Sequence, residues 1–194
     1  MRTFVWPFAV LASLFVFAAC QSKPQPQAPV KASIQAQPTE APFRTRLTIK
    51  EIMGSMVEPS ADALWNSVAT NVTDKGPEVK APQNDEQWGE IRKKGVTLVE
   101  AMNLIVMDGR HMAPAGVKSD NPNIELAPEQ IQELVDKDHT SWIMLAHGLQ
   151  DAAFTALKAI DAKDTDALSN AGGDIDAACE ACHVKYWYPN KKPA

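Results

Sequence analysis

The sequence predicts an all-α fold, an antiparallel four-helix bundle, on three observations. Apolar residues recur at helical spacing in four long segments between about residue 48 and residue 186. Proline, glycine and asparagine cluster between these segments, as they do where helices end. No stretch alternates apolar and polar residues over the length of a convincing strand. A segment of about 150 residues is the size of one domain with a single core.

The first expected helix covers about Thr48 to Thr70 and keeps the i, i+3/i+4 rhythm throughout. Pro59 falls in its middle, where proline removes a backbone hydrogen bond and clashes with the preceding turn. We therefore expect either one kinked helix or two abutting helices, the second capped by Ser60. We interpret Asn71 to Gln83 as a connecting segment.

Three further helices are expected after this connection. The second begins with Asn84 as its cap and ends near Met107. A long loop, Gly109 to Leu126, separates it from the third, and loops of this length are often functional. The third runs from Pro128, in its first turn, to about Ala162. The fourth runs from about Asp164 to Tyr186.

The last helix carries the most informative motif, Cys179-Glu180-Ala181-Cys182-His183. Two cysteines separated by two residues and followed by histidine have the spacing by which haem is attached through two thioethers. On a helix the three side chains stand at i, i+3 and i+4, on one face. A thiol–disulfide site and a metal site such as zinc are the alternative interpretations.

The first nineteen residues are typical of an export signal, with Arg2 followed by a short apolar run. Ala18-Ala19-Cys20 is similar to the end of a bacterial lipoprotein signal, so Cys20 is the expected lipid attachment site. The chain has three cysteines, and this assignment accounts for the one outside the motif. The alternative is a soluble periplasmic protein with a cleaved signal.

Residues 20–43 are rich in proline and glutamine, so we expect a disordered tether between the anchor and a bundle domain over residues 44–194. The formal net charge of −5 argues against a nucleic-acid partner, because phosphates attract basic proteins. No run of four or more lysine and arginine residues occurs, which also argues against a polybasic membrane patch. Membrane contact is therefore expected only through the lipid.

A four-helix pattern with Cys179-x-x-Cys182-His183 on its last helix resembles the cytochrome c′ family, the class II c-type cytochromes. The resemblance implies one covalent haem c on Cys179 and Cys182, with His183 as the axial iron ligand. It also implies an aromatic residue three positions after the histidine, matched by Tyr186. The family then has a basic residue where this chain has Trp187, a departure from the pattern.

In this family the second axial position faces the inner stripe of the first helix. The resemblance implies a low-spin member in which Met53 is that ligand, with Met56 or an open iron as alternatives, since methionine on such a stripe also serves as core filler. The expected function is single-electron transfer between redox partner proteins on the periplasmic side of the bacterial envelope, without enzymatic activity. The alternatives are a five-coordinate protein that binds nitric oxide or carbon monoxide, and a subunit of a larger complex. A homodimer is left open.

Overall fold

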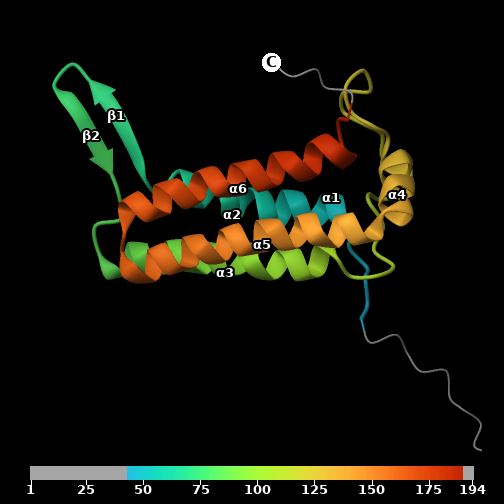
Figure 1. The fold of residues 1–194 in the computed structure, drawn as a ribbon, viewed down its shortest axis with the longest axis horizontal. Coiled ribbons are helices and arrows are strands. Elements are labelled where there is room, and N and C mark those ends of the chain that lie inside the picture. The colour runs from blue at the N-terminus through green and yellow to red at the C-terminus, as the bar shows by residue number, and fades with distance from the viewer. Residues whose placement is uncertain (1–42, 190–194) are drawn as a thin grey trace, which may run out of the picture. The chain divides into compact units, whose positions relative to one another are not determined.

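Four long helical runs pack side by side in the computed structural model, which describes residues 43–189. The predicted signal, Cys20 and most of the tether lie outside the described residues. Figure 1 shows each run antiparallel to its neighbours, and α5 packs against both α3 and α6 while α2 packs against the same two helices. The helical bundle expected from the sequence is therefore present. Its helical segments are α1 (Ile49–Ile52), the π-helical turn η1 (Met53–Val57), α2 (Glu58–Trp65), α3 (Asp85–Ile105), α4 (Pro128–Lys137), α5 (His139–Ala162) and α6 (Thr165–Tyr186).

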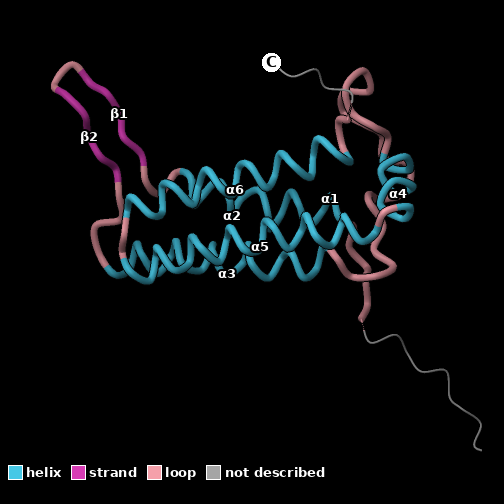
Figure 2. Tube along the Cα trace, in the orientation of Figure 1, coloured by secondary structure: helices cyan, strands magenta, loops and turns pink. Residues whose placement is uncertain are grey.

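The prediction of an all-α fold is wrong between the first two helical runs. Here β1 (Ala69–Thr73) and β2 (Gly76–Lys80) pair as an antiparallel hairpin, which Figure 2 shows in magenta, standing away from the helices. Gly76 adopts a φ of +111°, a left-handed conformation that favours glycine, and the Thr73 hydroxyl donates to its carbonyl. The β-branched residues on either side of this turn were the strand signal that the connecting-segment interpretation overlooked. The first helix accordingly ends at Trp65 and not at Thr70.

Pro59 does not divide the first helical run into two abutting helices, because the run continues through it with a local widening. In η1 the N–H of Glu58 donates to the carbonyl of Met53, five residues back, just before the proline that has no N–H to offer. The extra residue in this turn keeps the buried stripe in line, since Ile52 and Val57 are both buried although five residues apart. Ser60 is buried inside α2 and does not cap it.

The third predicted helix is in fact two, because the chain breaks at Asp138. This residue lies at φ −135° and ψ 58°, ends α4 and caps α5 by accepting a hydrogen bond from the Ser141 N–H. Asp138 also fastens the end of α6: its carboxylate pairs with Lys185 at 2.7 Å and its carbonyl accepts from the Tyr186 hydroxyl at 3.1 Å. The break thus joins the start of α5 to the end of the helix that carries the cysteine motif.

A single core runs along the interior of the helices. Leu98 on α3 and Ile175 on α6 are fully buried, and the small residues Ala153 and Ala156 let α5 approach its two neighbours closely. Among residues 43–189, no helix is both long enough and apolar enough to cross a membrane.

Candidate functional site

The motif lies in the last two turns of α6. Asp164 starts this helix by accepting the Ala167 N–H at 2.9 Å, and buried Tyr186 ends it. Cys179 and Cys182 are half-buried, form no disulfide, and pack against the core. Together with His183 they occupy positions i, i+3 and i+4, so the expected placement on one helical face is present.

The two thiols are poor nucleophiles in this environment. Burial raises the pKa of Cys179 to about 11, with a further contribution from the nearby Asp176 carboxylate. Burial likewise raises the pKa of Cys182 to about 12. A thiol–disulfide site needs the opposite, a thiolate stabilised near neutral pH. The electrostatics therefore disfavour the redox dithiol alternative.

His183 is half-buried, in surroundings that favour the neutral imidazole. Burial lowers its pKa below the usual value, although the carboxylates of Glu180 and Glu58 act in the opposite direction. Neutral imidazole is the form that binds a metal ion. Because the carboxylate of Glu58 affects the pKa of His183, the first residue of α2 lies near the motif.

Two aromatic rings contact the imidazole from the residues that follow it. The Trp187 ring lies edge-on to His183, with centroids 5.0 Å apart and planes at 87°. The Tyr188 ring lies at 5.9 Å and 61°, and its hydroxyl donates to the Glu180 carboxylate. Tyr186 points elsewhere: it is buried against Trp142, with centroids 5.3 Å apart. Sequence reasoning noticed Trp187 only as a departure from a family pattern.

Met53 and Met56 are half-buried and pack against the same core as the cysteines. Their height along the bundle follows from one contact between the antiparallel helices, in which the Trp65 indole N–H donates to the Gly172 carbonyl at 2.9 Å. Met53 precedes that contact by twelve residues and His183 follows it by eleven, about 18 and 16 Å along the helices at 1.5 Å per residue. Met56 lies about 14 Å away and Cys182 about 15 Å. Both methionines thus lie at the same height along the bundle as the motif. Their roles as iron ligands remain predictions.

An open pocket of about 410 Å³ lies between α2 and α6, one to two turns before the cysteines. Trp65 lines this pocket and, at 36% exposure, lies outside the buried core. A Cβ at Gly172 would stand 3.2 Å from the Trp65 ring, whereas a Cβ at Gly173 would meet nothing within 4 Å. Gly172 thus admits the indole ring, a pairing that the sequence alone does not reveal.

The long loop between α3 and α4 builds the start of the first helix. The carbonyls of His111 and Met112 accept the N–H groups of Ile49 and Lys50, each at 2.9 Å, and so satisfy two of the free donors of α1. The Arg110 guanidinium donates to the carbonyls of Leu104 and Leu47. The loop is therefore a structural element of the methionine-bearing end of the bundle.

A zinc site finds no support in the part of the chain that the structure describes, where no group of three or more His, Cys, Asp or Glu side chains is arranged to hold a metal ion. The donor set of the motif suits haem better. It offers two protonated, unpaired thiols and one neutral imidazole on a single half-buried face. These residues fit the group that the spacing predicts.

No family profile matches this sequence, and no curated protein matches it. Among solved structures, the chain is similar to a cytochrome c prime from Alcaligenes xylosoxidans, determined as the nitric oxide complex of a single-residue mutant. The two sequences are 21% identical and the TM-score is 0.44. The similarity covers 75% of this chain and 98% of the other.

Proposed function

We propose that this chain is a monohaem c-type cytochrome that transfers single electrons on the periplasmic side of the bacterial envelope. The observation that carries the proposal is the face of α6 on which Cys179, Cys182 and His183 lie together, half-buried and unpaired by any disulfide. When bound, the haem supplies an iron that exchanges one electron. The cysteines would hold it covalently and His183 would bind its iron.

The protein's own contribution is to fix this face and to keep it dry. Ile175, one turn before Cys179, is fully buried and holds α6 in the core. Asp138 holds the other end of the motif through Lys185 and Tyr186. A rigid, poorly hydrated surrounding limits the reorganisation that accompanies a change of charge at the iron, which suits electron transfer more than catalysis. We therefore propose no enzymatic activity.

The second axial ligand in this proposal is Met53, with Met56 as the alternative. Their position at the height of the motif supports both, and thioether ligation would favour a high reduction potential. A competing function, binding of nitric oxide or carbon monoxide at an open iron, has one observation in its favour. The residue of η1 that is fully buried is neither methionine but Val57.

We further propose that lipidation of Cys20 anchors the mature chain to a membrane and that a tether joins this anchor to the bundle. The partners would be redox proteins of the envelope. Replacement of Cys20 by serine tests the anchor: the lipoprotein proposal expects the protein to move from the membrane fraction to the soluble fraction. A wild-type protein that is already soluble after cell lysis would contradict it.

The central experiment is to express the full chain with its export signal in a bacterium that matures c-type cytochromes. The purified protein should be coloured in denaturing gels and heavier than the bare chain by one haem. The variant carrying both Cys179→Ala and Cys182→Ala should lose colour and added mass together. A colourless wild-type protein with two alkylatable thiols would refute the proposal and revive the thiol oxidoreductase.

The visible spectrum of the reduced protein with and without carbon monoxide identifies the sixth ligand. The Met53 assignment expects no change on adding the gas to the wild type, a change for Met53→Ala, and none for Met56→Ala. The reverse pattern for the two variants would assign Met56. A wild-type protein that binds the gas at once would favour the five-coordinate function.

A further inference from the structure

The ring of His183 is contacted by Trp187, which belongs to neither the proposed haem-binding set nor the buried core. We propose that Trp187, held in place by the long loop between α3 and α4, is a positioning residue that fixes the His183 ring and keeps water from it. This inference rests on the proposed function, because it concerns how firmly His183 would be held as a ligand of a bound haem.

The ring geometry is the first step. The indole of Trp187 meets the imidazole edge-on at a centroid distance of 5.0 Å, the arrangement that aromatic pairs prefer. Tyr188 supports it from the side, with its ring 5.6 Å from the indole. Trp187 is 37% exposed, so its outer part faces water while its inner part covers the histidine. A ring in this place restricts rotation of the imidazole about its side-chain bonds.

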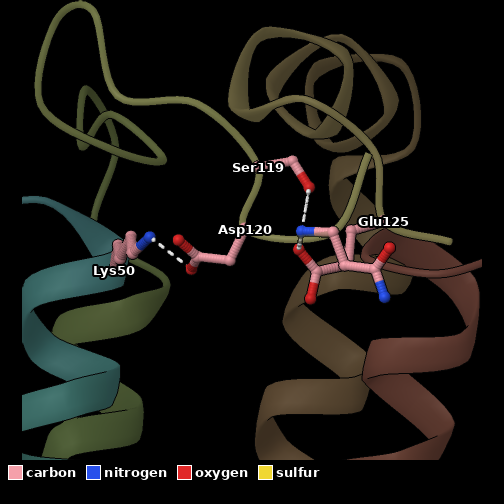
Figure 3. A network of polar contacts seen from close by, with 5 residues as sticks. Lys50, Ser119, Asp120 and Glu125 are labelled. Atoms are coloured by element: carbon pink, nitrogen blue, oxygen red, sulfur yellow. Dashed lines mark hydrogen bonds and ion pairs between the residues drawn. The ribbon is translucent and has the colours of Figure 1, made fainter. Parts of the chain in front are cut away.

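The loop holds the indole from the other side. The Leu126 N–H donates to the Trp187 carbonyl at 2.8 Å. The neighbouring carboxylate of Glu125 accepts the Ser119 hydroxyl at 2.8 Å and the Asn121 N–H at 3.0 Å (Figure 3). These two bonds, in that order, lower the pKa of Glu125, and the nearby Trp187 side chain adds to the effect. The backbone of Trp187 is thus bonded to this short segment, and its side chain lies near the carboxylate that the segment holds.

The same segment also reaches the first helix. Asp120, between Ser119 and Asn121, forms an ion pair with Lys50 at 3.2 Å, which Figure 3 shows as a bridge from the loop to α1. Lys50 lies three residues before Met53. This exposed pair adds little stability by itself. Its location matters more, because the loop spans the distance between the helix that carries His183 and the helix that carries the two methionines.

Mutation of a group that orients a metal-bound histidine typically changes metal affinity or activity by about 10- to 100-fold. Loss of the Trp187 ring would free the imidazole to rotate and admit water to it. Water stabilises the more highly charged ferric state, so the reduction potential should fall. A loosely held histidine is also displaced more easily by a competing ligand.

The experiment compares Trp187→Ala and Trp187→Phe with the wild type in the full-length, matured protein. Phe154→Ala is the matched control, because it removes an exposed aromatic ring from α5, away from the motif. All four proteins should carry one haem by mass, since both cysteines are intact. Trp187→Ala should show a lower reduction potential and should lose its native spectrum at about one-tenth of the free imidazole concentration that the wild type requires. Trp187→Phe should restore most of both properties.

Glu125→Gln provides a second variant if Trp187→Ala fails to fold. This variant keeps the indole but replaces the charged acceptor of the Ser119 and Asn121 hydrogen bonds with a neutral one. It should therefore change the reduction potential and the imidazole sensitivity in the same direction as Trp187→Ala, but by a smaller amount. Unchanged potential and imidazole sensitivity in Trp187→Ala would overturn the inference, as would a Trp187→Phe variant that behaves like the alanine variant. If the mass measurement shows no haem on the wild-type chain, both the proposed function and this inference are overturned.

Discussion

Two adjacent glycines on α6 give a sharp test of the packing beside the motif. Gly172 and Gly173 both lie inside the helix, where alanine is favoured over glycine by about 1 kcal/mol. Gly173 is exposed and a Cβ there would meet nothing within 4 Å. We therefore expect Gly173→Ala to raise the free energy of unfolding by about 1 kcal/mol and the melting temperature by about 3 °C.

The neighbouring substitution should have the opposite effect. At Gly172 a Cβ would stand 3.2 Å from the Trp65 ring, so the ring must move away from the helix. This movement of a few tenths of an ångström would strain the 2.9 Å hydrogen bond from the indole to the Gly172 carbonyl, and the strained bond and the crowding together would cost about 2 kcal/mol. Against the same helical gain, Gly172→Ala should lower the free energy of unfolding by about 1 kcal/mol.

The assay is urea unfolding followed by far-ultraviolet circular dichroism, with each variant purified under the same conditions and with any covalent group retained. The two variants should differ by about 2 kcal/mol, and the total tryptophan fluorescence should change only in Gly172→Ala, in which Trp65 moves. Equal stabilities for the two would refute the assigned role of Gly172. Strong destabilisation by Gly173→Ala would mean that another group, such as an edge of the macrocycle, lies against that residue in the mature protein.

Three other perturbations have clear expected outcomes. Ile175→Ala removes a fully buried side chain one turn before Cys179 and should lower the free energy of unfolding by about 2 to 5 kcal/mol in the same urea assay; a loss below 1 kcal/mol would contradict the packing. The pKa of Asp138 is lowered to about 2, chiefly by Lys185 and then by Ser141, so its contribution to stability is complete above the ordinary value of 3.8 and is lost as the pH falls towards 2. Asp138→Asn should therefore flatten the fall in melting temperature between pH 4 and pH 2, and an unchanged acid limb would count against the ion pair. Replacing residues 69–80 by a short glycine-containing loop should alter the free energy of unfolding by less than about 0.5 kcal/mol, because Val72 and Val79 are 88% and 68% exposed; a larger loss would show that the hairpin supports the bundle.

Local interactions made much of this structure predictable. The apolar rhythm, the Asn84 and Asp164 caps and Pro128 fixed the helical runs and several of their ends, because each depends on residues three or four positions away. The hairpin was missed because its strands are short and one contains a proline, which outweighed the β-branched residues beside Gly76. The break at Asp138 was missed because its cause, the end of α6, lies 47 residues further along the chain.

The sequence is enough to define the chemistry of the candidate site: two thiols and an imidazole at i, i+3 and i+4, a pattern that depends only on the period of one helix. What surrounds these groups depends on how the helices and the long loop pack. Burial shifted the pKa values of Cys179, Cys182 and His183, the antiparallel packing brought Met53 and Met56 to their height, and the long loop bonded to Trp187. The ring contact between Trp187 and His183 is local, four residues apart at the end of one helix. The contacts of the loop and of the methionine-bearing helix join residues about 60 to 130 positions apart, whose proximity follows from the packing of the whole core.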